Sequence, residues 1–270
     1  VSCYNTFAAA TIEVAHNDYN AVIVAASGNG GDGGEQYEAH YPSSYVHVLS
    51  VTALGENNRW NHWASYHESV DLGSPGEGIM STTNQNGTNT NAYQSWYGTS
   101  MASPLAASCI GLLSALNPEW NNEQLETMII ATSDPIIYNV NTEDYLQGKL
   151  GAGRVDAARS LLTPLFPKIE LVTTDYAIIG GNLDNIIDAG ESLDLSVILS
   201  NHSEWGDAIN PIISLTSNSN DIQVVNSNQS INNIASSDIY INDTNPFEVL
   251  ISNNIPSGNY ELKFAFSSNA

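Results

Sequence analysis

The run Gly98-Thr99-Ser100-Met101-Ala102-Ser103-Pro104 is the most informative part of this chain. It places a serine between a glycine turn and an apolar segment that predicts a helix to about Ala115. The unpaired N–H groups and the positive dipole end of a helix N-terminus favour a developing negative charge. Acyl transfer needs both features: an exposed hydroxyl that attacks a carbonyl carbon, and hydrogen-bond donors that stabilise the resulting oxyanion. A serine that merely caps the helix is the alternative interpretation.

A second motif lies upstream of this serine. Residues 21–26 are apolar and partly β-branched, and they end in Ser27-Gly28-Asn29. The pattern predicts a buried parallel strand that delivers Asn29 to the carboxyl edge of a sheet, where open α/β folds place their sites. A Gly-Asn pair after a strand is often only a turn. It indicates a functional site here because it occurs together with the serine motif.

Together the two motifs resemble those of the subtilisin-like serine proteases, the subtilases. Two further segments agree in order. Residues 70–76 resemble the family's Ala-Pro-Gly turn, with Ser74 in place of alanine, and residues 151–158 resemble the closing turn and last helix of its catalytic domain. The resemblance covers about residues 1–163. It implies an α/β fold, a subtilisin-like parallel sheet with flanking helices, whose N-terminal half is missing from this chain.

The resemblance also implies roles for individual residues. Ser100 would be the nucleophile, and the Asn29 side chain and the Ser100 N–H would be the oxyanion donors. The substrate would bind as an extended strand against residues 2–4, beside a pocket wall formed by residues 25–28. The substrate-binding residues are then Ser2, Cys3, Tyr4, Ala25, Ala26, Ser27, Gly28 and His40. His40 would stand at the floor of the primary specificity pocket, where its ring would shorten the pocket and could make the preference depend on pH.

The first two members of the catalytic triad are not found in the sequence. Subtilases carry the triad in the order Asp, His, Ser, so both residues belong upstream of the Asn29 strand. The six histidines are His16, His40, His47, His62, His67 and His202, and none stands in a His-Gly-Thr-His context. Each is interpreted as a surface or core residue. A serine without its base is a weak nucleophile, so the 270-residue chain alone is expected to be nearly inactive.

A rival function is that of a degenerate, non-catalytic homologue whose C-terminal module binds a surface or a partner. Two departures from the family favour it. Residues 105–108 read Leu-Ala-Ala-Ser where subtilases usually have His-Val-Ala-Gly, and Tyr4 stands where glycine is usual. The presence of both Ser100 and Asn29 favours the enzyme, a serine endopeptidase acting on protein or peptide substrates.

Composition limits the partners and the compartment. The chain has 29 acidic and 6 basic residues and a net charge of −23, which excludes nucleic-acid binding through displaced counterions. The acidic excess fits a secreted or cell-surface protein, and we expect a bacterial one. No apolar run reaches the roughly 18 residues that would predict a membrane span. Cys3 and Cys109 could form a disulfide or remain separate thiols, and their spacing predicts neither a metal nor a redox motif.

The composition changes at residues 162–164. Beyond it, short alternating strands are predicted at 169–172, 193–199, 222–225, 247–251 and 260–266, between turns rich in Asn, Ser, Gly and Asp. This pattern predicts an antiparallel β-sandwich. The domains are therefore expected at 1–163 and 164–270, the second resembling the immunoglobulin-like modules of secreted bacterial proteases.

One loop of this second domain is rich in oxygen ligands. Its carboxylates are Asp184, Asp188 and Glu191, beside two asparagine amides. Calcium prefers such ligands, but a solvated turn before a strand is the favoured interpretation of this composition. Calcium is thus a possible cofactor, and no organic cofactor is implied.

Overall fold

The structure is a computed structural model that describes residues 4–30, 36–83, 93–182 and 184–269. Its contacts divide the chain into two compact units, Val1–Thr163 and Pro164–Ala270. The division coincides with the change in composition.

The first unit is built on a parallel three-stranded sheet. Its strands are β1 (Val24–Ala26), β2 (Leu49–Leu54) and β3 (Leu72–Pro75), in the order β1-β2-β3. All six residues of β2 are buried. Helix α2 (Thr99–Leu116) packs across all three strands, and α3 (Asn122–Ala131) and α5 (Ala157–Leu162) pack against α2. The predicted parallel α/β arrangement is confirmed.

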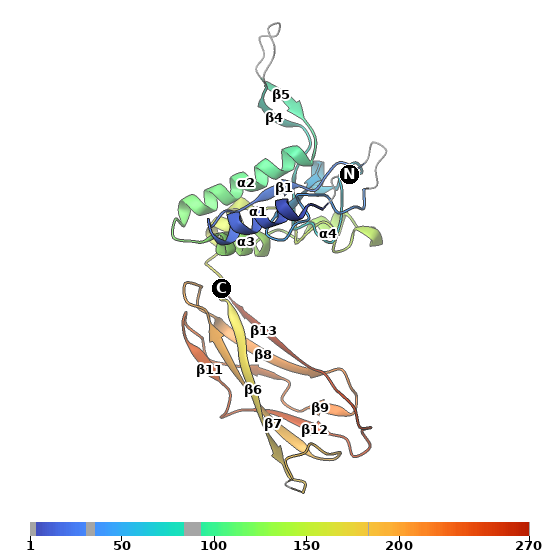
Figure 1. Cartoon of the computed structure of the whole chain (residues 1–270), viewed down its shortest axis with the longest axis vertical. Helices are drawn as coiled ribbons and strands as arrows, with labels where there is room; N and C mark the ends of the chain where they lie inside the picture. Colours follow the sequence, from blue (N-terminus) through green and yellow to red (C-terminus); the bar gives the residue numbers. More distant parts are fainter. Residues whose placement is uncertain (1–3, 31–35, 84–92, 183, 270) are drawn as a thin grey trace. The chain divides into compact units, whose positions relative to one another are not determined.

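The remaining elements of this unit surround that layer. They are α1 (Thr6–Asn17), α4 (Ile137–Val140), the 3₁₀ turns Glu56–Asn58 and Asp144–Leu146, and a hairpin of β4 (Ile79–Thr82) and β5 (Tyr93–Trp96). The hairpin extends away from the sheet and helices (Figure 1).

Helix α2 has the residue pattern that its position requires. Its buried residues recur every three or four positions, as one face of a helix does: Thr99, Ala102, Ala106, Ile110 and Leu113. The small residues Ala102 and Ala106 are fully buried, so the helix axis can approach the sheet closely. The predicted helix is confirmed to within one residue at its C-terminal end.

The expectation that no segment spans a membrane is not confirmed for this helix. Among the residues that the structure describes, α2 alone is long and apolar enough to do so by length and composition. Leucine, isoleucine and alanine raise its mean hydropathy, while serine, threonine and proline interrupt the apolar run. Its packing across three strands is that of a core helix in a folded domain.

Helix α1 has no buried residue and is attached through polar contacts. His16 Nε2 lies 3.2 Å from Glu126 Oε2 on α3, and the His16 ring stacks on His47 with centroids 4.1 Å apart. Burial lowers the pKa of His16, but hydrogen bonds with Asn17 and Glu126 outweigh it, so the pKa lies above 6.5. Burial also raises the pKa of Glu126, against the opposing effect of His16.

These two shifts predict that the first unit loses stability as the pH rises. A raised pKa in the folded state contributes stability below the unfolded pKa, which is lost as the pH rises through the folded value. The stabilising contribution of Glu126 is therefore lost as the pH rises above 4.5, and that of His16 is lost as the pH rises above 6.5. We therefore expect the temperature of thermal unfolding to fall as the pH rises from 4.5 to about 8. Glu126→Gln should make the unfolding temperature less dependent on pH. Glu119→Gln, at an exposed residue, is the control and should leave that pH dependence unchanged. The same pH dependence in the unmodified protein and both variants would contradict the role of the His16–Glu126 pair.

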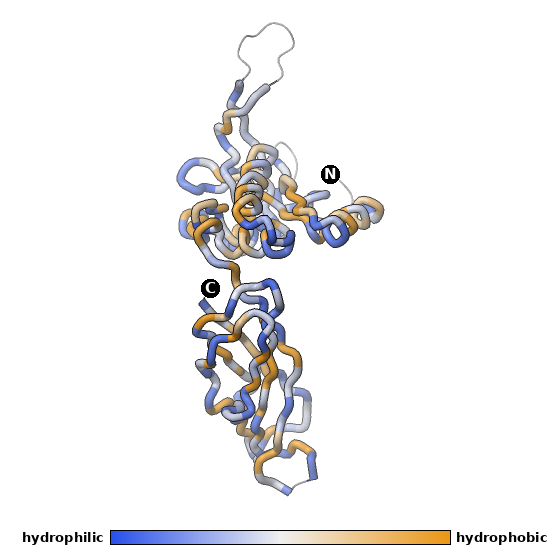
Figure 2. Tube along the Cα trace, turned by 90° about the vertical axis from the view of Figure 1, so that its left-hand side faces the viewer, coloured by the Kyte–Doolittle hydropathy of each residue, from blue (hydrophilic) through white to orange (hydrophobic). Residues whose placement is uncertain are grey.

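The second unit consists of two antiparallel sheets. Its strands are β6 (Ile169–Ile179), β7 (Ser192–Asn201), β8 (Ile209–Ser217), β9 (Ile222–Val224), β10 (Asn228–Ser230), β11 (Ile239–Ile241), β12 (Phe247–Ile251) and β13 (Leu262–Asn269). One sheet has the order β10-β8-β13, and the other has the order β11-β7-β12-β9, with β6 also paired to β7. Hydrophobic and hydrophilic residues alternate along these strands (Figure 2).

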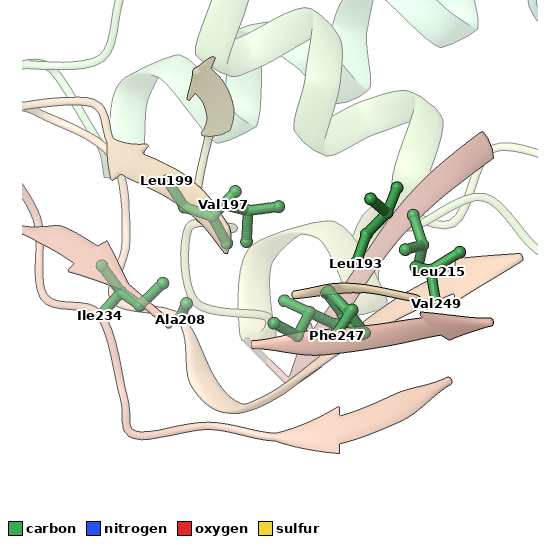
Figure 3. Packing of buried hydrophobic residues seen from close by; sticks show 9 residues of the cluster. Leu193, Val197, Leu199, Ala208, Leu215, Ile234, Phe247 and Val249 are labelled. Carbon is green, nitrogen blue, oxygen red and sulfur yellow. The ribbon is translucent and has the colours of Figure 1, made fainter. Parts of the chain in front are cut away.

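Both sheets contribute to one apolar core. Val197 and Leu199 of β7, Ile213 of β8 and Phe247 of β12 are fully buried in a single cluster (Figure 3). The antiparallel β-rich region predicted after residue 163 is therefore present.

Candidate active site

The site lies where β1 and β3 end and α2 begins. Gly98, which precedes the helix, donates its N–H to the Gly76 carbonyl at 2.8 Å. A Cβ on Gly76 would lie 2.5 Å from the Ala53 Cβ and 2.9 Å from the Gly98 oxygen. Only glycine fits so close an approach, and this contact fixes the start of α2 beside the carboxyl edge of the sheet.

Asn29, two residues beyond Ser27 at the end of β1, has a fixed side-chain orientation. Its Oδ1 accepts hydrogen bonds from the Thr99 N–H at 3.0 Å and from the Thr99 hydroxyl at 2.9 Å. The same hydroxyl accepts from the Gly28 N–H at 3.2 Å. Because Thr99 engages the amide oxygen, the Asn29 NH₂ group points to the other side and remains available as a donor.

The Asn29 amide and the Ser100 N–H converge on one space. A Cβ on Gly98 would lie 3.3 Å from Asn29 Nδ2 and 3.6 Å from the Ser100 nitrogen. Gly98 has no such atom and holds a φ of +148°, which other residues rarely adopt. Within the described part of the chain the Ser100 N–H has no hydrogen-bond acceptor, and the Ser100 side chain is exposed. Two donors beside an exposed hydroxyl form the geometry that a tetrahedral oxyanion needs.

Thr99 is thus a positioning residue, and its removal has a predictable effect. Thr99→Val keeps the shape but removes the hydroxyl, leaving Asn29 with one hydrogen bond and Gly28 with none from this group. We expect kcat to fall about 10-fold with little change in KM, because a misoriented donor affects the transition state more than substrate binding. Thr99→Ser should restore kcat. A larger effect on KM than on kcat, or no rescue by serine, would contradict this role.

The predicted pocket wall, residues 25–28, is described in full, whereas the predicted substrate-pairing strand is described only at Tyr4. Ala25 and Ala26 are half-buried in β1. Ser27 is buried and donates a hydrogen bond from its hydroxyl to the Ser65 carbonyl at 3.2 Å. Gly28 accepts a hydrogen bond from the Ser65 N–H at 2.8 Å. Ser2 and Cys3 lie outside the described residues. The assignment of residues 25–28 as a pocket wall, and of residues 2–4 as the strand that pairs with the substrate, stays a prediction.

Tyr4 and His40 have different neighbours. The Tyr4 ring, which is largely exposed, packs edge-on against Tyr41 and Tyr45, with centroids 5.4 and 5.2 Å away. His40 packs directly against Gly28, since a Cβ there would lie 2.6 Å from the His40 Cδ2. The structure thus brings His40 next to Gly28 and Asn29.

An apolar hollow beside Ser100 was not predicted from the sequence. It has a volume of about 100 Å³ and is lined by Ile79, Ser81, Thr82, Thr83, Gln94, Trp96 and Met101. Met101 directly follows Ser100, and the adjacent Tyr97 packs on Trp63 with ring centroids 5.5 Å apart. The aromatic residues just before Gly98 were the signal that could have indicated it.

In the described part of the chain, no histidine is hydrogen-bonded to the Ser100 hydroxyl. His16 contacts Glu126 and His47, His67 pairs with Ser69 at 2.9 Å, and His202 lies in the second unit, 3.1 Å from Glu170. These contacts agree with the interpretation of these histidines as surface or core residues.

The acidic loop of the second unit uses its side chains internally. Glu191 Oε2 accepts from the Asp188 N–H at 2.9 Å, and Asp184 Oδ1 accepts from the Ile186 N–H at 2.8 Å. Among the described residues, no three Asp, Glu, His or Cys side chains are arranged to hold a metal ion. Of the expected calcium ligands, Asp184 and Glu191 thus accept backbone hydrogen bonds, and Asp188 Oδ2 accepts from the Asn182 side chain at 3.2 Å.

Cys109 is a half-buried free thiol on α2, and Cys3 lies outside the described residues. Burial, and then the charge of Asp156, raise the pKa of the Cys109 thiol, so it is a poor nucleophile.

Residues 3–153 match the subtilase family (peptidase S8). The chain is 35% identical over 127 residues to the alkaline elastase YaB of Bacillus sp. (strain YaB), covering 46% of this chain and 31% of that protein. It is 33% identical over 127 residues to subtilisin Savinase of Lederbergia lenta, covering 46% of this chain and 44% of the relative. The chain thus spans less than half the length of these relatives.

A solved structure supports the fold. A protease of Pseudoalteromonas arctica PAMC 21717 superposes with a TM-score of 0.50 at 23% identity, over 59% of this chain and 47% of that one. The family match covers more than half of the chain and includes both the Asn29 and the Ser100 segments. The chain belongs to the subtilase family of serine proteases.

Proposed function

We propose that this chain carries the nucleophile and the oxyanion donors of a serine endopeptidase that hydrolyses peptide bonds through an acyl-enzyme on Ser100. The catalytic aspartate and histidine are supplied by a part of the protein that precedes Val1. The observation that carries the proposal is the double hydrogen bond from Thr99 to Asn29 Oδ1, which directs the Asn29 NH₂ toward the space beside Ser100.

The chemistry follows from these positions. The histidine takes the proton of Ser100 as Oγ bonds to the scissile carbonyl carbon, and the carbonyl oxygen becomes an anion. Asn29 Nδ2 and the Ser100 N–H donate to that anion. The C–N bond then breaks, and the histidine returns the proton to the departing amine. A water molecule then attacks the ester of the acyl-enzyme through the same steps, which releases the carboxylic acid product and restores the Ser100 hydroxyl.

The substrate lies across this site as an extended chain. Residues 2–4 pair with its backbone on the acyl side, and residues 25–28 form the wall of the primary pocket. On the leaving-group side, the hollow between the β4–β5 hairpin and Met101 suits an apolar side chain, since its wall includes Ile79 and Trp96. Protein and peptide chains are thus the substrates.

The second unit is an immunoglobulin-like accessory module on a secreted or cell-surface bacterial protein. Its two antiparallel sheets around one core and the strongly acidic composition of the chain support this assignment. A cell wall-associated protease of Bacillus subtilis (strain 168), 38% identical over 119 residues, is consistent with the same compartment.

The test uses the protein as its gene encodes it, treated with a fluorophosphonate that reacts with activated serines. We expect one label per molecule, on the peptide that contains Ser100, and parallel loss of peptide hydrolysis. A protein that is folded yet neither labelled nor able to cleave a casein digest would instead be a non-catalytic binding homologue.

A further inference from the structure

His40 lies against the backbone beside the oxyanion donor. A Cβ on Gly28 would lie 2.6 Å from the His40 Cδ2, 2.7 Å from Nε2 and 2.8 Å from Cγ. The imidazole face therefore covers the Gly28 Cα. Gly28 directly precedes Asn29, so the ring stands within one residue of the amide that would hold the oxyanion.

The position of His40 is set by its own backbone. Its carbonyl accepts hydrogen bonds from the Ser44 N–H at 2.7 Å and from the Ser43 hydroxyl at 2.8 Å. The ring has no comparable anchor: its Nε2 is buried without a hydrogen-bond partner, and Glu38 Oε2 is 3.9 Å away. The ring nitrogen Nε2 thus forms no hydrogen bond among the described residues, while the ring itself packs against Gly28.

That space is where the residue preceding the scissile bond must place its side chain. The carbonyl oxygen of this substrate residue faces Asn29 Nδ2, and the Cα of the residue is bonded to the carbon of that carbonyl. The side chain of the substrate residue therefore begins beside Gly28, where the lack of a Cβ on Gly28 leaves room. The His40 ring occupies that room, since three of its atoms lie within 2.8 Å of the position that a Gly28 Cβ would take.

We propose that His40 closes the primary specificity pocket, so that the enzyme cleaves after small residues such as glycine, alanine and serine and excludes leucine and phenylalanine. This inference rests on the proposed peptidase function and names its substrate class. Its basis is size: a large side chain would have to displace an imidazole that is packed between Gly28 and a fixed backbone.

The test compares peptide p-nitroanilides that differ only in the residue before the cleaved bond, which is alanine, leucine or phenylalanine. For the unmodified protein we expect kcat/KM to be about 100-fold higher for alanine than for phenylalanine. His40→Gly should raise the phenylalanine value by about 10-fold or more and change the alanine value little. His40→Gln, which keeps most of the volume and removes the imidazole, should retain the preference for alanine. His62→Gly, at an exposed histidine of the same unit, is the matched control.

The outcomes separate this inference from the function on which it rests. A protein that is not labelled by the fluorophosphonate and cleaves none of the three peptides refutes the peptidase. A labelled, active protein that prefers leucine or phenylalanine before any substitution refutes the pocket closure, even if His40→Gly does not fold. An alanine preference that His40→Gly leaves unchanged also refutes it, because another residue must then close the pocket.

Discussion

Ser100→Ala is expected to lower kcat for peptide hydrolysis by about 10⁶, the size of the effect that loss of the nucleophile has in subtilisin. The reason is that no bond to the substrate carbonyl can form without Oγ. KM should change little, because the hydroxyl is exposed and the pocket walls and the hairpin hollow remain. The measurement is kcat and KM on a peptide substrate, with fluorophosphonate labelling of the same preparation.

A matched serine on the same helix provides the control. Ser108→Ala removes an exposed hydroxyl that donates to the Pro104 carbonyl at 2.7 Å, and it should leave kcat unchanged. Both variants should unfold within about 0.5 kcal/mol of the unmodified protein, as is usual for exposed positions. If Ser100→Ala kept its turnover while remaining folded, the nucleophile would have to be another residue.

The sequence was sufficient for the local parts of the site. The helix after Gly98 and the strand before Asn29 are set by short patterns, a glycine turn followed by residues with helical spacing and a β-branched run. The orientation of the Asn29 amide could not be predicted in this way. It depends on Thr99, which lies 70 positions away in the sequence and is brought there by the sheet.

Two kinds of element escaped prediction for physical reasons. Strand β8 was not predicted, because Pro211 and a positive φ at Asn210 interrupt its pattern, although the strand is central in its sheet. The hollow beside Met101 combines residues from two strands and a helix, which no local pattern joins. Composition also failed to distinguish ligands from caps in the acidic loop, where Glu191 and Asp184 bind backbone N–H groups.

Asn29→Leu is expected to lower kcat by about 10²–10³, the magnitude known for the corresponding donor of subtilisin, with KM nearly unchanged. Leucine keeps the side chain's shape but cannot donate to the oxyanion, and that hydrogen bond strengthens only as the negative charge develops. The substitution also frees the Thr99 hydroxyl and N–H, so thermal unfolding must be measured beside kinetics at saturating substrate. A proportionate rise in KM would mean that Asn29 binds the substrate and not the transition state.

The double variant Asn29→Leu/Thr99→Val tests how the two residues are coupled. If Thr99 acts only by orienting Asn29, its removal should have almost no further effect on kcat once the amide is gone, since residues in one hydrogen-bond network are not additive. Additive losses would mean that the Thr99 hydroxyl contributes to the transition state independently. We expect the first result, because in the unmodified protein the single hydroxyl proton of Thr99 is donated to Asn29 Oδ1 and not to an oxyanion. A hydroxyl freed by Asn29→Leu that then donated to the oxyanion would instead make the double variant slower than Asn29→Leu alone.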